Sequence, residues 1–534
     1  MLILPLLLLL CHSVFGVDIV AESVKRLQKS NPEACDNFYR HTCPEDTSEN
    51  LIEKYYIKEI IEKVKKHFEE PGNQFNFIND FKKFEIKGKT RVLYDATTHL
   101  PEYNVQNLIE LYRKRCDAQE DLEPLFKQFK KLFTYGGTST SNLTLQEFVE
   151  CDENHFLIEE KLVEFGKVFK NQLPISYEKY YEKYHRTPFK HSNLTAFVSI
   201  AQNLLRDSLL DMTGAKMMKT DSTIVKGIEI VAKMIEDMKE IAKDWVEETK
   251  WVQKNDAVGK IQDMIENIIM IKEFDSLIKG TDELFTRVEI SYETCRAEIG
   301  SDDELSNILC LMVVYVENEF SEQRSPYILI HNASNGGSRL NIGFSVLLAA
   351  VKIEEPAGMI GFVGATVGHE IGHSLEKINA NVPFFSNISS QCVFKLYEDT
   401  CKVFEEISCV NHLSQEGETV SDVFGNQLSY QIFKDHFGDR VKKMHPTLNI
   451  TYEQLFFYGT THTFCYPEKS VQPRNDDGTL NEHPAHNIRV NAIAQNPAFK
   501  TAFNCSSDSR MVKIIEEECF IYGPNAPATR RHKK

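Results

Sequence analysis

Two histidines four residues apart, His369 and His373, form the pattern in this chain that most directly indicates chemistry, within the segment ATVGHEIGHSLE. On a helix, residues four apart project from one face, so both imidazoles reach a single Zn²⁺ ion. Glu370 stands beside the first histidine, where it would hold a water molecule next to that ion. The competing interpretation is a chance spelling, because the chain contains 17 histidines.

A catalytic zinc ion needs a third protein ligand and one open coordination position. Glu418, in the segment GETVSD, is the best candidate, because a helix expected over 418–433 places Glu418 and Asp422 on one face. Asp422 would then accept the N–H of a ligand histidine and fix its tautomer. The alternative is an acidic helix N-terminus, which the helix dipole stabilises.

The elements around these residues are expected to be mostly helical. Apolar stripes at helical spacing run through 50–320, one of them from Ile224 to Met238, and the first clear strand signal is Tyr327 to Ile330. Glycines recur at helical spacing around the histidine pair, which would weaken an isolated helix. We therefore expect a buried helix that another backbone approaches closely at these positions: Gly361, Gly364, Gly368 and Gly372.

The chain opens with the apolar run MLILPLLLLLCHSVFG and reaches Asp18 and Glu22 soon afterwards. A membrane-spanning helix needs about 20 apolar residues, whereas a signal peptide needs fewer. We expect a signal peptide over 1–16, a mature chain from Val17, no stable membrane insertion and a secreted, extracellular protein. The net charge of −17 argues against nucleic-acid partners, because the phosphate backbone would repel such a chain.

All of the 13 cysteines except Cys11 lie in the expected mature chain, and their number there is even. No CxxC pair occurs, so an oxidising compartment and disulfides are favoured over zinc thiolates. The chain also carries six N-x-S/T sequons, which fit the secretory route. Five of them are candidate glycosylation sites: Asn142, Asn193, Asn387, Asn449 and Asn504.

Six segments in chain order resemble the neprilysin family of secreted and membrane zinc endopeptidases. They are CDNFYRHTC, YVENEF, HNASNGGSRLNIGF, GHEIGH, GETVSD and EHPAHNIRVNAIAQNPAFKTAFNC. The third is similar to the family's Asn-Ala substrate strand, and the last three are similar to its zinc helix, its Glu-xxx-Asp helix and its C-terminal His/Arg segment.

The resemblance implies a role for each matching residue. His369, His373 and Glu418 would bind one zinc ion per chain, and Glu370 would be the general base. Asp422 would orient a ligand histidine. On the substrate side, Asn332 and Ala333 would hold the peptide backbone, His483 would stabilise the oxyanion, and Arg489 would bind a substrate carbonyl.

This chain also departs from the family pattern. Ser334 follows Asn-Ala where an aromatic residue is usual, and it creates a sequon at Asn332, which we expect to be unoccupied. Glu376 and Asn481 each stand where an aspartate is usual, and Asn481 removes a carboxylate that would support the His483 position. Only a short segment separates YVENEF from HNASNGG, so the lid over the cleft is expected to be reduced.

The resemblance also implies four disulfides: Cys35–Cys505, Cys43–Cys465, Cys116–Cys295 and Cys392–Cys519. Elimination then leaves Cys401–Cys409 and Cys151–Cys310, although sequence alone does not establish connectivity.

Together these points predict a mainly α fold with a small β-sheet. It would comprise a gluzincin-type catalytic domain, with the HExxH helix and the Glu-xxx-Asp helix, and a second helical, reduced lid domain. The expected ranges are an N-terminal segment at 17–49 stapled to the catalytic domain, a helical domain at 50–320 and a catalytic domain at 321–534.

The expected function is zinc-dependent hydrolysis of short peptides on the amino side of apolar residues. One rival is a catalytically impaired pseudoenzyme of the same fold that binds peptides outside the cell. The other is a disulfide-rich structural protein with an accidental HExxH motif. The sequence makes no prediction of the oligomeric state.

Overall fold

The computed structural model describes most of the C-terminal half of the chain and parts of the remainder. The described ranges are 19–27, 33–43, 108–134, 143–150, 156–164, 216–270, 274–300, 304–317, 333–376, 387–404, 415–465, 483–515 and 518–526, with isolated residues between 56 and 76 and at 214. The chain divides into two compact units. Unit 1 comprises 1–60, 218–272 and 327–534, and unit 2 comprises 61–217 and 273–326.

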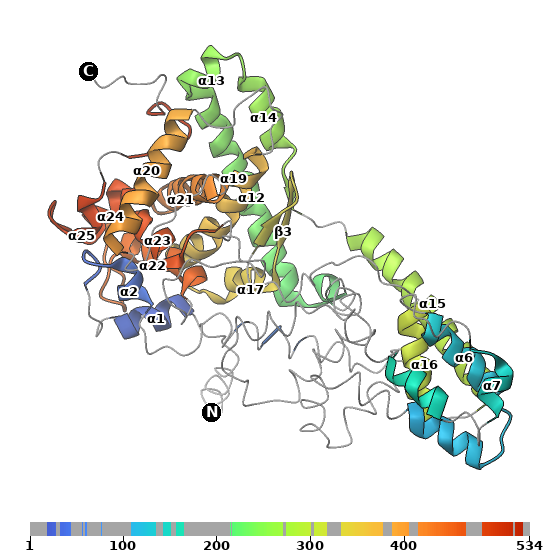
Figure 1. Ribbon diagram of the computed structural model, residues 1–534. Helices are drawn as coiled ribbons and strands as arrows, with labels where there is room; N and C mark the ends of the chain where they lie inside the picture. The colour runs from blue at the N-terminus through green and yellow to red at the C-terminus, as the bar shows by residue number, and fades with distance from the viewer. Residues whose placement is uncertain are drawn as a thin grey trace, which may run out of the picture. The chain divides into compact units, whose positions relative to one another are not determined.

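Unit 2 is helical in its described part (Figure 1). Its helices include α6 (Glu123–Thr134), α7 (Leu145–Val149), α15 (Phe274–Ile299) and α16 (Glu304–Glu317). Phe148 of α7 lies fully buried between three other rings, at centroid distances of 4.8 Å from Tyr112, 5.3 Å from Phe126 and 5.4 Å from Phe129. These aromatic contacts supply the apolar core on which the short helix α7 depends.

Unit 2 also corrects two expected disulfides. Cys295 of α15 is bonded to Cys310 of α16, with 5.6 Å between their Cα atoms. The pairings Cys116–Cys295 and Cys151–Cys310 are therefore wrong. The reason is local, because α15 and α16 are consecutive and adjacent helices, which bring these two cysteines within bonding range. Cys116 is also disulfide-bonded, while Cys151 lies outside the described residues.

Unit 1 combines a small sheet with many helices, and α19 packs against two of its strands (Figure 1). Its N-terminal elements are α1 (Ile19–Leu27), α2 (Phe38–Thr42), α12 (Ser222–Glu248), α13 (Lys250–Lys254), α14 (Val258–Glu266) and β1 (Ile269–Met270). Next come β2 (Ala333–Asn335), β3 (Arg339–Ile342), α17 (Phe344–Lys352), α18 (Pro356–Met359), the π-helix η5 (Ile360–Gly364), α19 (Ala365–Glu376) and α20 (Asn387–Phe404). The remainder are α21 (Glu416–Phe437), η7 (Gly438–Arg440), α22 (Tyr452–Thr461), η8 (His462–Phe464), α23 (His486–Asn491), η9 (Ala492–Gln495), α24 (Pro497–Ala502) and α25 (Arg510–Lys513).

The sheet has the strand order β1-β3-β2. β1 pairs with β3 in parallel, and β2 pairs with β3 in antiparallel register, with Ala333 opposite Ile342. β2 therefore lies at one edge of the sheet, and it packs against α19. The mainly α fold with a small sheet is as the sequence predicts, whereas the expected strand at 327–330 lies outside the described residues.

Helix α12 buries the apolar stripe that the sequence predicts, including Ile224, Val231 and Met238. The side chain of Asp221 caps its first turn by accepting from Thr223 N and Ile224 N at 3.0 and 3.1 Å. This helix packs on α17 and α21, and β1 adds to β3. Residues 218–272 therefore belong to unit 1, so the two compact units differ from the contiguous ranges that the sequence suggests.

The N-terminal segment is part of unit 1. Ile19 and Val20 of α1 are fully buried, and α2 packs against α22 and α23. Three of the expected disulfides are present in this unit: Cys35–Cys505, Cys43–Cys465 and Cys392–Cys519. The first two join the N-terminal segment to the C-terminal third of the chain.

Helices α19 and α21 pack closely enough for their backbones to touch. A Cβ atom on Gly368 of α19 would lie 2.8 Å from Gly425 Cα of α21, and one on Gly372 would lie 2.7 Å from Ser421 Oγ. Any side chain at these positions would separate the helices. The expected close approach of another backbone at the glycine stripe is thus confirmed.

Among the described helices, none combines the length and apolar composition that a membrane crossing requires.

Candidate active site

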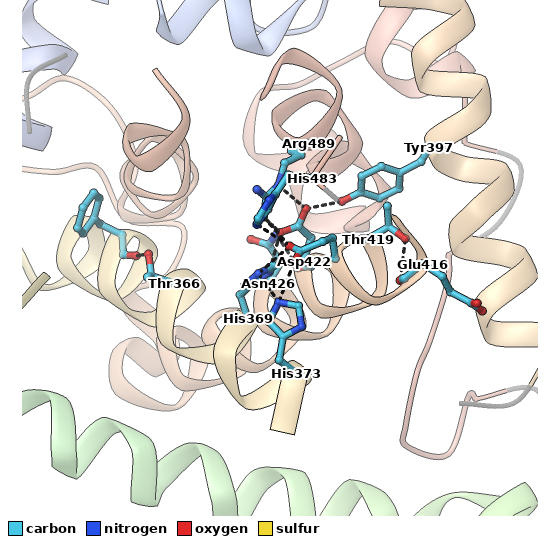
Figure 2. Close-up of polar contacts among 12 residues, drawn as sticks. Thr366, His369, His373, Tyr397, Glu416, Thr419, Asp422, Asn426, His483 and Arg489 are labelled. Carbon is cyan, nitrogen blue, oxygen red and sulfur yellow. Dashed lines mark hydrogen bonds and ion pairs between the residues drawn. The ribbon is translucent and has the colours of Figure 1, made fainter. Parts of the chain in front are cut away.

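Two helices bring the expected metal-binding residues together. His369 and His373 lie one turn apart on α19, and Glu418 lies in the first turn of α21. The Glu418 carboxylate lies 3.2 Å from His369 Nε2 through Oε2, and 3.3 Å from His373 Nε2 through Oε1. The two imidazole Nε2 atoms are 2.9 Å apart. Figure 2 shows both imidazoles pointing from α19 toward α21.

The chemistry of this group of residues fits a zinc ion. Asp422 Oδ1 lies 2.9 Å from His369 Nδ1, and a carboxylate only accepts, so in the neutral, metal-binding form of the ring the proton belongs on Nδ1 and the lone pair on Nε2 faces His373 and Glu418. One ligand atom from each of His369, His373 and Glu418 lies within 4.8 Å of the other two. Two imidazoles and one carboxylate are the ligand set of a zinc site that keeps an open position.

Burial and charge act in opposite directions on these groups. For His369, burial lowers the pKa, but hydrogen bonding to Asp422 and Glu418 outweighs burial and raises the pKa to about 9. For Glu418, burial raises the pKa, yet the three surrounding histidines hold this pKa well below its usual range. Without a metal, the site therefore holds an anionic carboxylate that attracts positive charge.

Glu370 lies beside the metal-binding group on α19 and is only 4% exposed. Burial raises the pKa of its carboxyl, and the charges of His369 and His373 act in the opposite direction. Its backbone oxygen accepts a 2.6 Å hydrogen bond from Asn335 Nδ2, and the same amide nitrogen lies 2.6 Å from Ser374 Oγ. The edge strand β2 is thereby fastened to the zinc helix at Glu370.

The substrate side of the site is described in part. Ala333 lies on the edge strand β2 and is 8% exposed, while Asn332 lies outside the described residues. The hydroxyl of Ser334 accepts from Asn341 Nδ2 at 3.3 Å, which holds this side chain on the sheet. Asn481 and the side chain of Glu376 also lie outside the described part of the chain.

His483 reaches the same carboxylate as the metal-binding histidines. Its Nε2 atom lies 3.0 Å from Glu418 Oε2, and its side chain is 35% exposed. Gln415 Nε2, at the N-cap of α21, donates to the backbone oxygen of His483 at 3.3 Å. His483 is thus partly exposed beside the metal-binding group, and its expected contact with the oxyanion stays a prediction.

Arg489 of α23 makes a buried ion pair with Asp422. Its Nε donates to Oδ2 at 2.8 Å and its Nη2 donates to Oδ1 at 2.6 Å. The ring of Phe464 covers the guanidinium, with 4.5 Å from Cζ to the ring centroid. These contacts give Arg489 a structural partner inside the site, and its expected contact with a substrate carbonyl stays a prediction.

Sequence reasoning missed two residues that the structure adds to this site. Tyr397 of α20 donates a 3.0 Å hydrogen bond from its hydroxyl to Asp422 Oδ2 (Figure 2). Asn335 fastens β2 to α19, as described above. Tyr397 looks like a core residue of an amphipathic helix, so it gives no signal of its own. Asn335 gives a weak signal, because an asparagine is uncommon inside a strand.

An HExxH helix together with a glutamate ligand from a second helix defines a metal site of the gluzincin type. Residues 354–519, about a third of the chain, match Peptidase family M13, and the chain is similar to neprilysin-like proteins over a comparable length.

Individual relatives agree with this match over a similar length of the chain. The chain is 31% identical over 170 residues to Membrane metallo-endopeptidase-like 1 of Mus musculus, covering 28% of this chain and 22% of that protein. It is 25% identical over 169 residues to Neprilysin-1 of Caenorhabditis elegans, again covering 28% of this chain and 22% of that protein. The matched part thus spans about a fifth of each curated relative.

One solved structure is similar over nearly the full length of the chain. It is titled Haemonchus galactose containing glycoprotein complex, and it has a TM-score of 0.53 at 13% identity, covering 94% of this chain and 98% of that chain. At this identity the likeness concerns the fold.

Proposed function

We propose that this chain is a secreted zinc-dependent endopeptidase that hydrolyses short peptides on the amino side of apolar residues. The observation that carries the proposal is the convergence of His369, His373 and Glu418 on one point, with Glu370 beside them. The match to Peptidase family M13 supports the same chemistry.

The residues of the chain have distinct parts in the proposed reaction. When bound by His369, His373 and Glu418, zinc supplies a Lewis acid that lowers the pKa of a water ligand toward about 7. Glu370 takes the proton from the attacking water and passes it to the leaving amine. His483 donates to the oxygen on which negative charge develops.

The edge strand β2 is the proposed binding surface for an extended peptide. Its pairing with β3 uses one edge, and a peptide added at the other edge gains main-chain hydrogen bonds. Ala333 lies on this strand, next to the position expected to supply the Asn332 amide. The bond from Asn335 to the Glu370 backbone fixes the distance between this surface and the general base.

The preference for apolar residues rests on the family resemblance. Ala365 and Thr366 lie about one turn before His369, where larger apolar residues are usual in the family. The Thr366 hydroxyl donates to its own helix, at Phe362 O and 3.0 Å. We therefore expect a modified side-chain pocket. Cleavage of a peptide library followed by mass spectrometry would identify the residues on the carbonyl side and on the amine side of the cleaved bond.

Secretion is also part of the proposal. Asn449 and Asn504 lie in exposed turns with φ of 53° and 51°, positions at which a bulky glycan meets no packed neighbour. Glycopeptide mapping of the secreted protein should find both occupied and Asn332 bare, and N-terminal sequencing should begin at Val17. A fully glycosylated Asn332 would favour the peptide-binding pseudoenzyme instead, because its amide would be consumed.

The direct test compares cleavage of a fluorogenic peptide by wild type and by Glu370→Gln. The variant keeps the shape and the metal ligands but lacks the base, so turnover should fall by about 10²–10⁴-fold with zinc content unchanged. Glu240→Gln changes an exposed glutamate of α12 and serves as the matched control. Equal turnover in wild type and Glu370→Gln would refute the proposed mechanism, and zinc binding without turnover in wild type would identify the pseudoenzyme.

A further inference from the structure

The carboxylate of Asp422 is buried at 6% exposure and receives donors from three other helices. His369 of α19 lies 2.9 Å from Oδ1, and Arg489 of α23 donates to both oxygens. Tyr397 of α20 donates to Oδ2 at 3.0 Å. Figure 2 shows the phenol approaching Asp422 from the side opposite to α19.

These four contacts occupy all of the acceptor positions of the carboxylate, which has about four lone-pair directions. Oδ1 serves His369 and Arg489, while Oδ2 serves Arg489 and Tyr397. If the two hydrogen bonds from Arg489 were the only ones that held Asp422, the carboxylate could move together with the guanidinium. A donor from a separate helix on Oδ2 opposes that movement, and so keeps Oδ1 in place against the His369 ring.

The helix that carries Tyr397 is itself well anchored. Cys392 of α20 is bonded to Cys519, and Ser389 Oγ donates to Phe520 O at 2.9 Å. Gln427 of α21 donates to Cys519 O at 2.8 Å, so the same C-terminal segment holds both α20 and the helix of Asp422. Burial raises the pKa of Tyr397 well above its usual range, which keeps the phenol protonated as a donor.

We propose that Tyr397 is a positioning residue of the metal site, which acts through Asp422 to fix the tautomer and orientation of the ligand His369. This inference rests on the proposed function only in that His369 binds the metal. The hydrogen bond of the phenol goes to Asp422, which is not one of the three expected zinc ligands. Its effect should therefore appear in metal affinity, which is measurable without any peptide.

The test is Tyr397→Phe in the full chain, with zinc affinity measured by competition against a chromophoric chelator. Phenylalanine keeps the ring, and Arg489 Nε still donates to Asp422 Oδ2, so the metal-free variant should fold with a melting temperature near that of wild type. Zinc affinity should fall by about 10-fold, the lower end of the loss that follows removal of a direct partner of a ligand histidine, because Tyr397 acts through Asp422. The cobalt-substituted variant should also show altered visible absorption bands, because the orientation of the His369 ring changes.

The matched control is Tyr458→Phe, which removes another buried hydroxyl of unit 1, one that lies 2.9 Å from His41 Nε2. It should alter the melting temperature without altering zinc affinity or the cobalt spectrum. Unchanged zinc affinity in Tyr397→Phe would overturn the inference and leave the proposed function standing. Absence of zinc binding in wild type would overturn both.

Discussion

The metal side and the substrate side of this site differ in the burial of their polar side chains. On the metal side, four helices place His369, Asp422, Arg489 and Tyr397 in one buried network with short contacts. On the substrate side, His483 is 35% exposed, and the edge strand carries Ser334 at a position where the resemblance leads us to expect an aromatic residue. Under the proposed function, this contrast predicts that substitutions on the metal side affect zinc binding and turnover, whereas substitutions on the substrate side affect peptide affinity.

The largest effect should come from the metal side. Glu418→Ala removes one of three ligands and the carboxylate on which three imidazoles converge. Zinc measured by plasma emission should fall from one ion per chain to nearly none, and peptide turnover should be lost with it. Circular dichroism should show an unchanged helix content. Full zinc retention by this variant would show that another group is the third ligand.

A smaller loss of turnover is expected for a substitution of His483, which contacts the ligand Glu418 and is partly exposed. His483→Ala should lower kcat by about 10²–10³-fold, because it removes a donor to the developing oxyanion, while zinc content stays the same. His436→Ala, which changes an exposed histidine at the end of α21, is the control and should have wild-type turnover. A loss of zinc in His483→Ala would instead assign this residue to the metal side.

The C-terminal segment around Cys519, which holds α20 and α21, should make the melting temperature depend on pH. Burial raises the pKa of Glu518, next to Cys519, to about 7, with the charge of Lys434 acting in the opposite direction. Because folding raises the pKa of Glu518, its favourable contribution to the free energy of unfolding is present below the pKa of the unfolded chain. This contribution is lost as the pH rises through about 7. Glu518→Gln should therefore raise the melting temperature at pH 8 and leave it unchanged at pH 4. An equal change at both pH values would contradict this assignment.

The smallest effect should come from the substrate side. Ser334→Tyr restores the aromatic residue that the family usually carries and removes the sequon at Asn332. We expect KM for a short peptide to fall a few-fold with kcat nearly unchanged, because the substitution adds contact area without touching the reacting atoms. A higher KM would mean that this surface has adapted to a different ligand, and would sharpen the contrast between the two sides.

Local periodicity explains how much of the site the sequence predicts. The spacing of His369 and His373, and that of Glu418 and Asp422, follows from the helical repeat, because residues four apart share a face whatever surrounds the helix. The apolar stripe of α12 is predicted on the same basis, and so are the glycines that let another backbone approach α19. Each of these patterns lies within a single element.

Only the tertiary structure shows which elements meet. The contact between α19 and α21 at Gly368 and Gly425 brings Glu418 to the histidines. The family resemblance led us to expect this pairing, whereas no pattern within either segment shows that the two helices touch. Tyr397 reaches Asp422 from a separate helix, and Cys295 bonds to Cys310 because α15 and α16 lie side by side. Such pairings depend on the packing of the whole unit, since a side chain's partner is set by which surfaces fit together rather than by its neighbours along the chain.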